Sequence, residues 1–418
     1  MQSVLVIGGG LGGFTTVQSL RQRGFEGAIT LVDPEGLPYD RPPLSKEYLL
    51  GQAEAAKIAF QPEQWYRDQD ITLIAATATA IDPDTGTVQL SDGSEHRADR
   101  IVLATGGHAR TLPIPGAELP GVLVLRTRAD ADALRARITP GSRTVVVGAG
   151  LIGAEVASAI GELGGHCTLV DPADPPLAAA LGDDAAAHLH AMHRTRGVDV
   201  VTGAPSEIAV AGGHLQVAVS GGAEPETITA DTVLIGVGIT AATELAESAG
   251  LRVDRGIVVD DHQQTSHPAV YAVGDVARTA ATDGTLLPRS EHWENAMRTG
   301  DTAAAALLSE ALPEHGAPWF WSDRHQVHVE AVGSLTGPGE IVLRRDADQL
   351  RAVFRIDGGH LLGAVALDDA NTVRAARRII DRDIPVSAQE LADPAIPLKK
   401  LTKNRRPTEG SAAMGVQP

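Results

Sequence analysis

Cysteine is almost absent from this 418-residue chain, because Cys167 is the only one. A single cysteine cannot form an intrachain disulfide, so the fold requires no oxidising compartment and we expect the cytoplasm. It also excludes a pair of thiols that relays electrons. Cys167 lies in the strand-like run HCTLV, where it is expected to be a small buried apolar residue. Any redox chemistry must therefore pass from a cofactor to its acceptor without protein sulfur.

Long apolar runs and excess positive charge are also missing. We find no run of about 18 apolar residues and expect no membrane span. A strand-like run begins by Val4, which leaves no room for a signal peptide. The net charge is −18, which argues against nucleic acid as a partner because phosphates would be repelled. The length predicts two or three domains.

Glycine, by contrast, is abundant, and several glycines occur in a regular motif. The run Val4–Gly13 reads VLVIGGGLGG and contains Gly8-x-Gly10-x-x-Gly13 between a strand-like run and a helical pattern, with Asp33 ending the next strand-like run. Such a turn lets a pyrophosphate approach bare backbone at the positive end of a helix. The sequence therefore predicts a dinucleotide site, the alternative being a plain tight turn between strand and helix.

A second unit repeats the pattern. Thr144–Gly153 reads TVVVGAGLIG, with Gly148-x-Gly150-x-x-Gly153, and the strand-like run after its helix ends at Asp171. Two such units predict two dinucleotides, a nicotinamide and a flavin, between which electrons pass.

Further residues are candidates for contact with these dinucleotides. Asp275 ends the run AVYAVGD, where it either accepts a hydrogen bond from a cofactor hydroxyl or caps a turn. In Arg41–Pro42–Pro43 the prolines exclude a regular helix, and a short helix carrying Lys46 is expected after them. Arg41 and Lys46 are either a cationic platform for a flavin or two solvated charges.

We predict an α/β fold with two Rossmann-like dinucleotide-binding domains of the glutathione-reductase type and a C-terminal α+β domain. Alternating patterns from Pro318 onward predict that its sheet is antiparallel. The expected division is an FAD-binding domain (1–110 and 242–317), an NAD-binding domain (111–241), a C-terminal domain (318–401) and a poorly ordered tail (402–418).

Several longer motifs carry a resemblance to a known family: YDRPPLSK (39–46), ATGGHARTLPIPG (104–116), LRT (125–127), VVGAGLIGAEVA (146–157), YAVGD (271–275), EHW-x-NA (291–296) and WFWSD (319–323). Over nearly its whole length the chain resembles the thiol-free, FAD-dependent NADH:ferredoxin reductases. These serve ring-hydroxylating dioxygenases and cytochrome P450 systems, and are of the putidaredoxin-reductase, rubredoxin-reductase and biphenyl-dioxygenase-reductase type.

The resemblance implies roles for individual residues and no metal ligands. The residues implied to bind FAD are Gly8, Gly10, Leu11, Gly12, Gly13, Arg41, Lys46, Ala104, Thr105, Gly106, Arg126, Asp275, Trp293 and Trp321. Asp33 and Glu35 compete for the FAD ribose. The residues implied for the nicotinamide side are Gly148, Gly150, Ile152, Gly153, Glu155, Asp171, Gly238 and Glu291. Lys46 and Glu155 are the implied catalytic pair, which would position the nicotinamide without exchanging protons; alternatively, Glu155 is an acid favoured by the helix dipole.

The nucleotide preference follows from chemistry. A carboxylate at Asp171 accepts hydrogen bonds from a ribose 2′-hydroxyl and repels a 2′-phosphate. The next residues, 172–175, offer no arginine and add Asp174. NADH is therefore expected rather than NADPH.

The resemblance implies that electrons go from NADH through FAD to a [2Fe–2S] ferredoxin, in a monomer or weak dimer. Candidate docking patches are the arginines 374, 377 and 378, which Asp381 can neutralise, and the basic run Lys399, Lys400, Lys403, Arg405 and Arg406. The alternative for either patch is that its charges are only solvated. Alternatives are an NADH oxidase or peroxidase, and a non-enzymatic NADH-sensing flavoprotein of the apoptosis-inducing-factor type.

Overall fold

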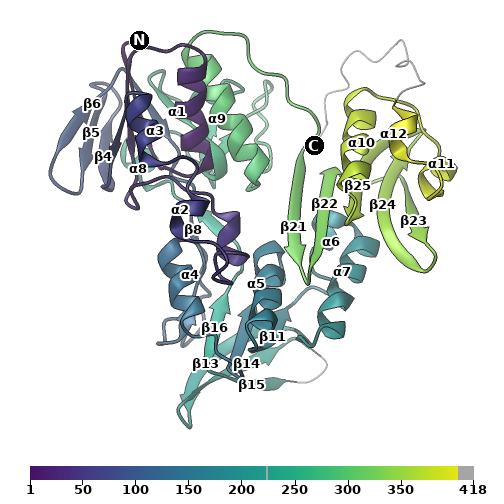
Figure 1. Cartoon of the computed structure of the whole chain (residues 1–418). Helices are drawn as coiled ribbons and strands as arrows, with labels where there is room; N and C mark the ends of the chain where they lie inside the picture. Colours follow the sequence, from purple (N-terminus) through teal and green to yellow (C-terminus); the bar gives the residue numbers. More distant parts are fainter. Residues whose placement is uncertain (223–224, 403–418) are drawn as a thin grey trace.

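A parallel sheet buried on both faces organises the first part of the structure, a computed structural model that describes residues 1–222 and 225–402 (Figure 1). The sheet has the order β19-β7-β1-β2-β3 and consists of β19 (Val270–Ala272), β7 (Arg100–Leu103), β1 (Ser3–Ile7), β2 (Ala28–Val32) and β3 (Ile71–Ile74). Leu5 and Ile7 of β1 face one apolar core, whereas Val4 and Val6 face another. Both faces are covered, as the near-continuous apolar runs require.

Two long helices cover one face of this sheet, and smaller elements surround it. α1 (Leu11–Gln22) and α9 (Trp293–Leu307) pack against each other. The smaller elements are η1 (Pro42–Ser45), α2 (Ala55–Ile58), α3 (Glu63–Asp68), β4 (Ala78–Asp82), β5 (Thr87–Leu90), β6 (Glu95–Arg97), α8 (Glu244–Ser248), β18 (Ile257–Val259), η2 (Gly274–Val276) and β20 (Ala277–Thr279).

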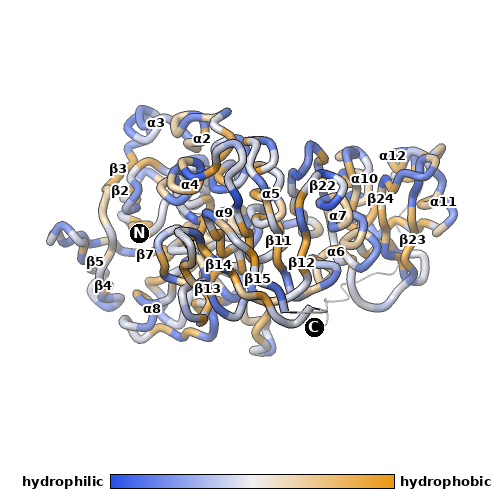
Figure 2. The backbone as a smooth tube through the Cα atoms, turned by 90° about the horizontal axis from the view of Figure 1, so that it is seen from below, coloured by the Kyte–Doolittle hydropathy of each residue, from blue (hydrophilic) through white to orange (hydrophobic). Residues whose placement is uncertain are grey.

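The second part repeats the architecture with a sheet of order β12-β11-β10-β16-β9. It contains β9 (Val122–Leu123), α4 (Arg128–Arg135), β10 (Arg143–Val147), α5 (Leu151–Glu162), β11 (His166–Asp171), α6 (Ala178–Leu181), α7 (Asp183–Thr195), β12 (Asp199–Thr202), β13 (Ala204–Ala211), β14 (His214–Ser220), β15 (Glu226–Ala230) and β16 (Thr232–Ile235). Figure 2 shows apolar residues concentrated along the strands and polar residues on the outer loops.

The chain passes between these two parts twice. It leaves the first sheet after β7 and returns after β16, and the two connections pair as antiparallel strands β8 (Gly107–Ala109) and β17 (Ile239–Ala241). This pairing holds the two sheets in a defined mutual position beside the residues that line the site described below.

The third part is an antiparallel sheet of order β21-β22-β25-β24-β23. Its elements are β21 (Trp319–Arg324), β22 (Val327–Gly333), β23 (Glu340–Asp346), β24 (Gln349–Asp357), β25 (His360–Leu367), α10 (Ala370–Asp381), α11 (Ala388–Ala392) and α12 (Leu398–Leu401). One face carries Phe354 against α10, and the other packs Val353 and Val365 on Leu181 and Leu189 of the second part. The sheet is thus both a domain core and an interface.

Two local predictions were wrong. The helix around Lys46 is a 3₁₀ helix that begins at the prolines, Pro42–Ser45, and Lys46 follows it. Proline is compatible with the first helical positions because its missing N–H has no partner there. The strand predicted over Ala269–Asp275 ends at Ala272, and Asp275 lies in η2.

Within the described residues, every helix is too short or too polar to cross a bilayer. The predicted tail lies outside the described residues except for Thr402.

Candidate functional site

The two glycine-rich turns have the same geometry. Gly8 and Gly148 have φ of +108° and +99°, which only glycine adopts without strain. A Cβ on Gly13 would stand 2.0 Å from the Gly8 carbonyl oxygen, and one on Gly153 1.9 Å from that of Gly148. The third glycine of each motif thus lets the helix pack directly on the turn.

The first helical N–H groups of both turns are open to a ligand. Around a Cβ placed on Gly150 no described atom lies within 4 Å, and around one on Gly10 the nearest atom is Arg41 Nε at 4.0 Å. Open backbone at the positive end of a helix suits a pyrophosphate.

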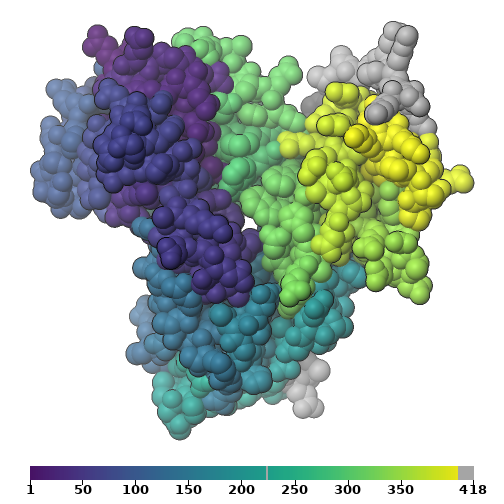
Figure 3. Space-filling view, viewed as in Figure 1, coloured from purple at the N-terminus to yellow at the C-terminus, as the bar shows by residue number. Residues whose placement is uncertain are grey.

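One cavity of about 310 Å³ connects the two units. In Figure 3 the molecule is hollowed where its N-terminal, middle and C-terminal parts meet. The predicted site residues that line the cavity are Gly8, Gly10, Leu11, Gly12, Asp33, Arg41, Lys46, Ala104, Thr105, Gly106, Arg126, Ile152, Glu155, Gly238, Asp275, Glu291, Trp293 and Trp321. The predicted residues that do not line it are Gly13, Glu35, Gly148, Gly150, Gly153 and Asp171.

Asp33, rather than Glu35, holds the position at the first turn. The Asp33 carboxylate accepts hydrogen bonds from the N–H of Gly9 at 2.6 Å and of Glu35 at 2.8 Å. The Glu35 carboxylate instead accepts from the Tyr39 hydroxyl at 2.7 Å, away from the cavity. Asp171 repeats the Asp33 contact, accepting from the N–H of Ala149 at 2.7 Å. The geometry favours Asp33 for a ribose at the first turn.

Arg126 is a partly buried cation that faces the cavity. Thr127 caps α4, and the Asp130 carboxylate accepts hydrogen bonds from the N–H groups of Arg126 and Thr127 at 3.0 and 2.8 Å, which fixes the backbone there. The Arg126 guanidinium reaches Asp275 Oδ2 at 3.2 Å, while its buried Nε has no partner among the described residues. Burial lowers the pKa of Arg126. This donor fits the polar atoms of a bound flavin dinucleotide.

Lys46 and Glu155 form an ion pair of 2.8 Å at the meeting point of all three parts. The Glu155 carboxylate also accepts hydrogen bonds from the hydroxyls of Ser45 at 2.5 Å and Ser322 at 2.7 Å. The Glu155 side chain is only 4% exposed. A buried charge with three donors keeps one orientation.

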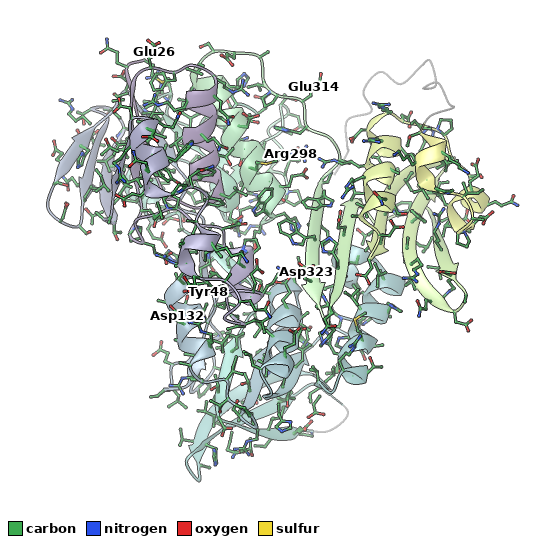
Figure 4. All side chains as sticks on the ribbon, in the orientation of Figure 1. Glu26, Tyr48, Asp132, Arg298, Glu314 and Asp323 are labelled. Carbon is green, nitrogen blue, oxygen red and sulfur yellow. The ribbon has the colours of Figure 1, made fainter. Side chains whose placement is uncertain are left out.

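The segment that carries Lys46 is fastened to the second part. Figure 4 labels Tyr48 and Asp132, which lie side by side where this segment meets α4. The Tyr48 hydroxyl is 3.2 Å from Asp132 Oδ1. Lys46 is therefore part of the first unit in the sequence, but its segment contacts the second unit.

Aromatic side chains close the cavity on the C-terminal side. Trp293 meets Trp321 edge to face at 5.7 Å between ring centroids, and Trp321 stacks on Trp319 at 5.1 Å. The Trp293 indole N–H donates to Asp40 at 3.0 Å, and burial raises the pKa of Asp40. Trp293 and Trp321 line the cavity, and all three rings are partly exposed.

Several cavity residues were not predicted from the sequence. They include Asp40, Leu44, Ser45, Leu125, Ile235, His292 and Phe320. Most lie inside the motifs YDRPPLSK, LRT, EHW-x-NA and WFWSD, so the motif letters contained the signal although no role was assigned to these positions.

Cys167 and one arginine of the predicted patch, Arg377, take structural positions. Cys167 is 3% exposed in β11, does not line the cavity, and burial raises the pKa of its thiol. Arg377 is engaged by Glu294 at 2.5 Å and lies 4.0 Å from Asp381, whereas Arg374 and Arg378 are exposed. In the other predicted patch, Lys399 and Lys400 lie on α12, and Lys403, Arg405 and Arg406 lie outside the described residues.

Comparison with known families agrees with this site. Residues 2–300 match the model described as pyridine nucleotide-disulphide oxidoreductase, and residues 319–402 match the reductase C-terminal model. The chain belongs to the pyridine nucleotide-disulphide oxidoreductase family. Its single cysteine means that this member carries no redox-active pair of thiols of its own.

Two of the similar proteins are reductases of electron-transfer systems. Rhodocoxin reductase of Rhodococcus erythropolis is 36% identical over 411 residues, covering 97% of this chain and 96% of that protein. The ferredoxin–NAD(+) reductase subunit of the benzene 1,2-dioxygenase system of Pseudomonas putida is 38% identical over 400 residues, covering 93% and 95%. The resemblance inferred from the motifs is confirmed.

Solved structures give the same result for the fold. The reductase in the covalent putidaredoxin reductase–putidaredoxin complex superposes with a TM-score of 0.88 at 34% identity, covering 96% of this chain and 98% of that one. A ferredoxin reductase from Rhodopseudomonas palustris gives 0.90 at 33% identity, covering 96% and 100%. The predicted fold class is confirmed.

Proposed function

We propose that the chain is an NADH:ferredoxin reductase, in which electrons pass from NADH through FAD to a [2Fe–2S] ferredoxin that feeds a P450 or Rieske-type oxygenase. The observation that carries the proposal is the single cavity lined from both glycine-rich units and bridged by the Lys46–Glu155 pair. The names of the similar proteins support the same reading.

The residues present fit the two cofactors. The first turn with Asp33, Arg41, Lys46 and Arg126 would hold FAD, and the unpartnered Nε of Arg126 is a donor that awaits an acceptor. The second turn with Asp171 would hold NADH. Bound FAD supplies a group that accepts two electrons as a hydride and gives them up one at a time.

The protein's own contribution is alignment and exclusion of water. Lys46 and Glu155 orient the nicotinamide against the flavin without gaining or losing protons, and Trp293 and Trp321 keep solvent from the reacting faces. The tryptophans at the edge, with Trp321 partly exposed, form the side on which we place ferredoxin docking.

We further propose the domain division, the oligomeric state and the localisation that the sequence predicts. The FAD-binding, NAD-binding and C-terminal domains span 1–110 with 242–317, 111–241 and 318–401. The protein acts as a monomer or weak dimer in the cytoplasm, where NADH is available to the second unit.

The test is reduction followed by transfer. The purified full chain is loaded with FAD and titrated with NADH without oxygen, and then a [2Fe–2S] ferredoxin and cytochrome c are added. We expect the flavin colour to bleach and cytochrome c reduction to depend on the ferredoxin. A protein that binds no FAD, or whose bound FAD is not bleached by NADH, would falsify the proposal.

The same experiment separates the alternatives. Rapid oxygen consumption without ferredoxin would indicate an NADH oxidase. The burial of Cys167 disfavours the peroxidase alternative. A reduced protein that persists with every ferredoxin and dimerises would indicate an NADH-sensing flavoprotein.

A further inference from the structure

A buried arginine lies one hydroxyl group away from the Lys46–Glu155 pair. Arg324, the last residue of β21, is 2% exposed. Its Nη2 donates to Ser322 Oγ at 2.9 Å, and Ser322 Oγ donates to Glu155 Oε1 at 2.7 Å. Ser322 is fully buried. The hydroxyl therefore transmits the position of the arginine to the carboxylate.

Several charges meet in this cluster, and His328, which lies 2.9 Å from the carboxylate of Glu330, is part of it. Lys46 and Arg324 are both cations, and Glu155 is the carboxylate joined to them. Asp323 is engaged by His328 at 2.6 Å. Burial lowers the pKa of Arg324 to about 10, which still leaves it charged at neutral pH. Its Nε is buried without a hydrogen-bond partner in the part of the chain that the structure describes. Arg324 is thus a fixed positive charge that is joined to Glu155, a cavity residue, through the hydroxyl of Ser322.

The tip of the β21–β22 hairpin fixes this arginine. His325 and Gln326 form the turn with φ of +51° and +62°, a conformation that is unfavourable for residues other than glycine. The N–H of His325 donates to Ser158 Oγ of α5 at 2.7 Å, and its ring nitrogen lies 2.9 Å from that of His193 of α7. The turn is therefore held in place by the second part, on the same helix that carries Glu155.

We propose that Ser322 and Arg324 are positioning residues for hydride transfer: Ser322 orients Glu155, and Arg324 holds Ser322 and supplies a fixed positive charge that favours electrons on the bound flavin. The inference rests on the proposed function. In the reaction NADH gives up two electrons and one proton as a hydride and becomes NAD⁺, and the acceptor gains negative charge. A fixed positive charge nearby stabilises that gain without rearrangement.

The variants separate orientation from charge. Arg324→Met removes the charge, Arg324→Lys keeps it, and Ser322→Ala removes the link while leaving the charge in place. Arg344→Met is the matched control, because Arg344 is also a buried arginine of the C-terminal sheet but donates to the carbonyls of Leu391 and Glu390 away from the site.

Two quantities are measured on the FAD-loaded proteins: the midpoint potential of the flavin, and the rate of its reduction by NADH in single turnover. For Arg324→Met we expect a midpoint potential lower by about 30 mV, which is a tenfold change in the equilibrium constant of a two-electron couple. For Ser322→Ala we expect about tenfold slower reduction, or about 1.4 kcal/mol in the barrier, with an almost unchanged potential. Arg324→Lys should recover the potential, and Arg344→Met should change neither quantity.

The inference is overturned if Arg324→Met has the wild-type potential, or if Arg344→Met shifts it equally. If Arg324→Met does not fold, wild-type reduction kinetics in Ser322→Ala would overturn it instead. Suppose that the wild-type protein binds FAD, that NADH bleaches this FAD, and that the variants have the same potential and reduction rate. The further inference is then wrong, and the proposed function still stands.

Discussion

The two glycine-rich units are alike in their turns and different in what covers them. In the first, the position after Leu11 is Gly12, and in the second the equivalent position after Leu151 is Ile152. A Cβ on Gly12 would lie 3.3 Å from Val273, and one on Gly300 of α9 would lie 2.6 Å from the Gly12 carbonyl oxygen. Ile152, in contrast, is 44% exposed at the cavity.

The difference shows how one backbone device serves two purposes. α9 lies so close to the start of α1 that only glycine fits at position 300, and the space around Gly12 is narrow, so the first unit is closed on that side. The start of α5 is open. We infer that the closed unit retains its cofactor and that the open one lets its coenzyme enter and leave.

The strongest test of the comparison is to add one methyl group to the third glycine of each motif. Gly13→Ala and Gly153→Ala both place a Cβ about 2 Å from a carbonyl oxygen. We expect Gly13→Ala to lose FAD almost completely. Gly153→Ala should keep FAD but require at least about 100-fold more NADH, a loss of about 2.7 kcal/mol. Flavin absorbance and NADH titration measure the two effects. Equal loss of FAD in both variants would contradict a division of labour between the units.

Exchanging the residues at the covered and open positions gives the next largest effect. Gly12→Ile forces a branched side chain against α9 and should lower the unfolding temperature and flavin content sharply, since overpacking costs about 1–3 kcal/mol or more. Ile152→Gly should cost about 1 kcal/mol in helix stability and raise the NADH requirement only a few-fold. Thermal unfolding with and without added FAD tests both. If Gly12→Ile retains FAD normally, α9 does not enclose the first unit as described.

The acids at the strand ends sharpen the comparison further. Asp171→Asn keeps an acceptor for the N–H of Ala149 but removes the charge that repels a 2′-phosphate. We expect the NADH-to-NADPH ratio of kcat/KM to fall about tenfold, or about 1.4 kcal/mol. Asp33→Asn is the control, because its contact to Gly9 is equivalent but belongs to the other unit. A coenzyme preference that follows Asp33 would reverse the assignment of the two sites.

The last test concerns the acid stability of the joint that fastens the second unit to the C-terminal hairpin. Burial, followed by nearby Arg324, lowers the pKa of His193 to about 3. Burial, followed by Arg196 and Arg324, lowers that of His325 to about 4. Both rings are neutral when folded and take up protons when unfolded below about pH 6.5. Stability is therefore full above pH 6.5 and falls as the pH decreases toward about 4, by at most about 1.4 kcal/mol per pH unit for each ring.

The matched variant for this joint is His193→Gln, which keeps polar atoms but does not titrate. Unfolding temperatures of the two proteins between pH 7.5 and 5 should diverge, with the wild type losing stability more steeply. Parallel curves would show that the neutral histidine pair does not control the joint.

The sequence alone was sufficient for features that depend on neighbouring residues. It correctly predicted which glycines form the tight turns and allow close packing of helix on turn, namely Gly8, Gly13, Gly148 and Gly153. The need for glycine at these positions arises within one strand, turn and helix. The antiparallel C-terminal sheet followed from alternation along its strands in the same way. The packing of the other face of this sheet against Leu189 could not be predicted in this way, because that contact is made by another part of the chain.

Only the tertiary structure decided which polar groups meet. Glu155 binds Ser45 and Ser322, which are 110 and 167 residues away in the chain, and nothing in the local pattern of any of the three predicts the contact. Arg377 was a candidate docking residue for which Asp381 was the expected competing partner, but its nearer partner is Glu294 of α9. Short-range patterns encode turns, strands and helices, whereas the partners of a buried charge depend on how complete domains pack. The chemistry of the site is therefore encoded in the identities of its residues, and its geometry is produced by the assembly of all three parts.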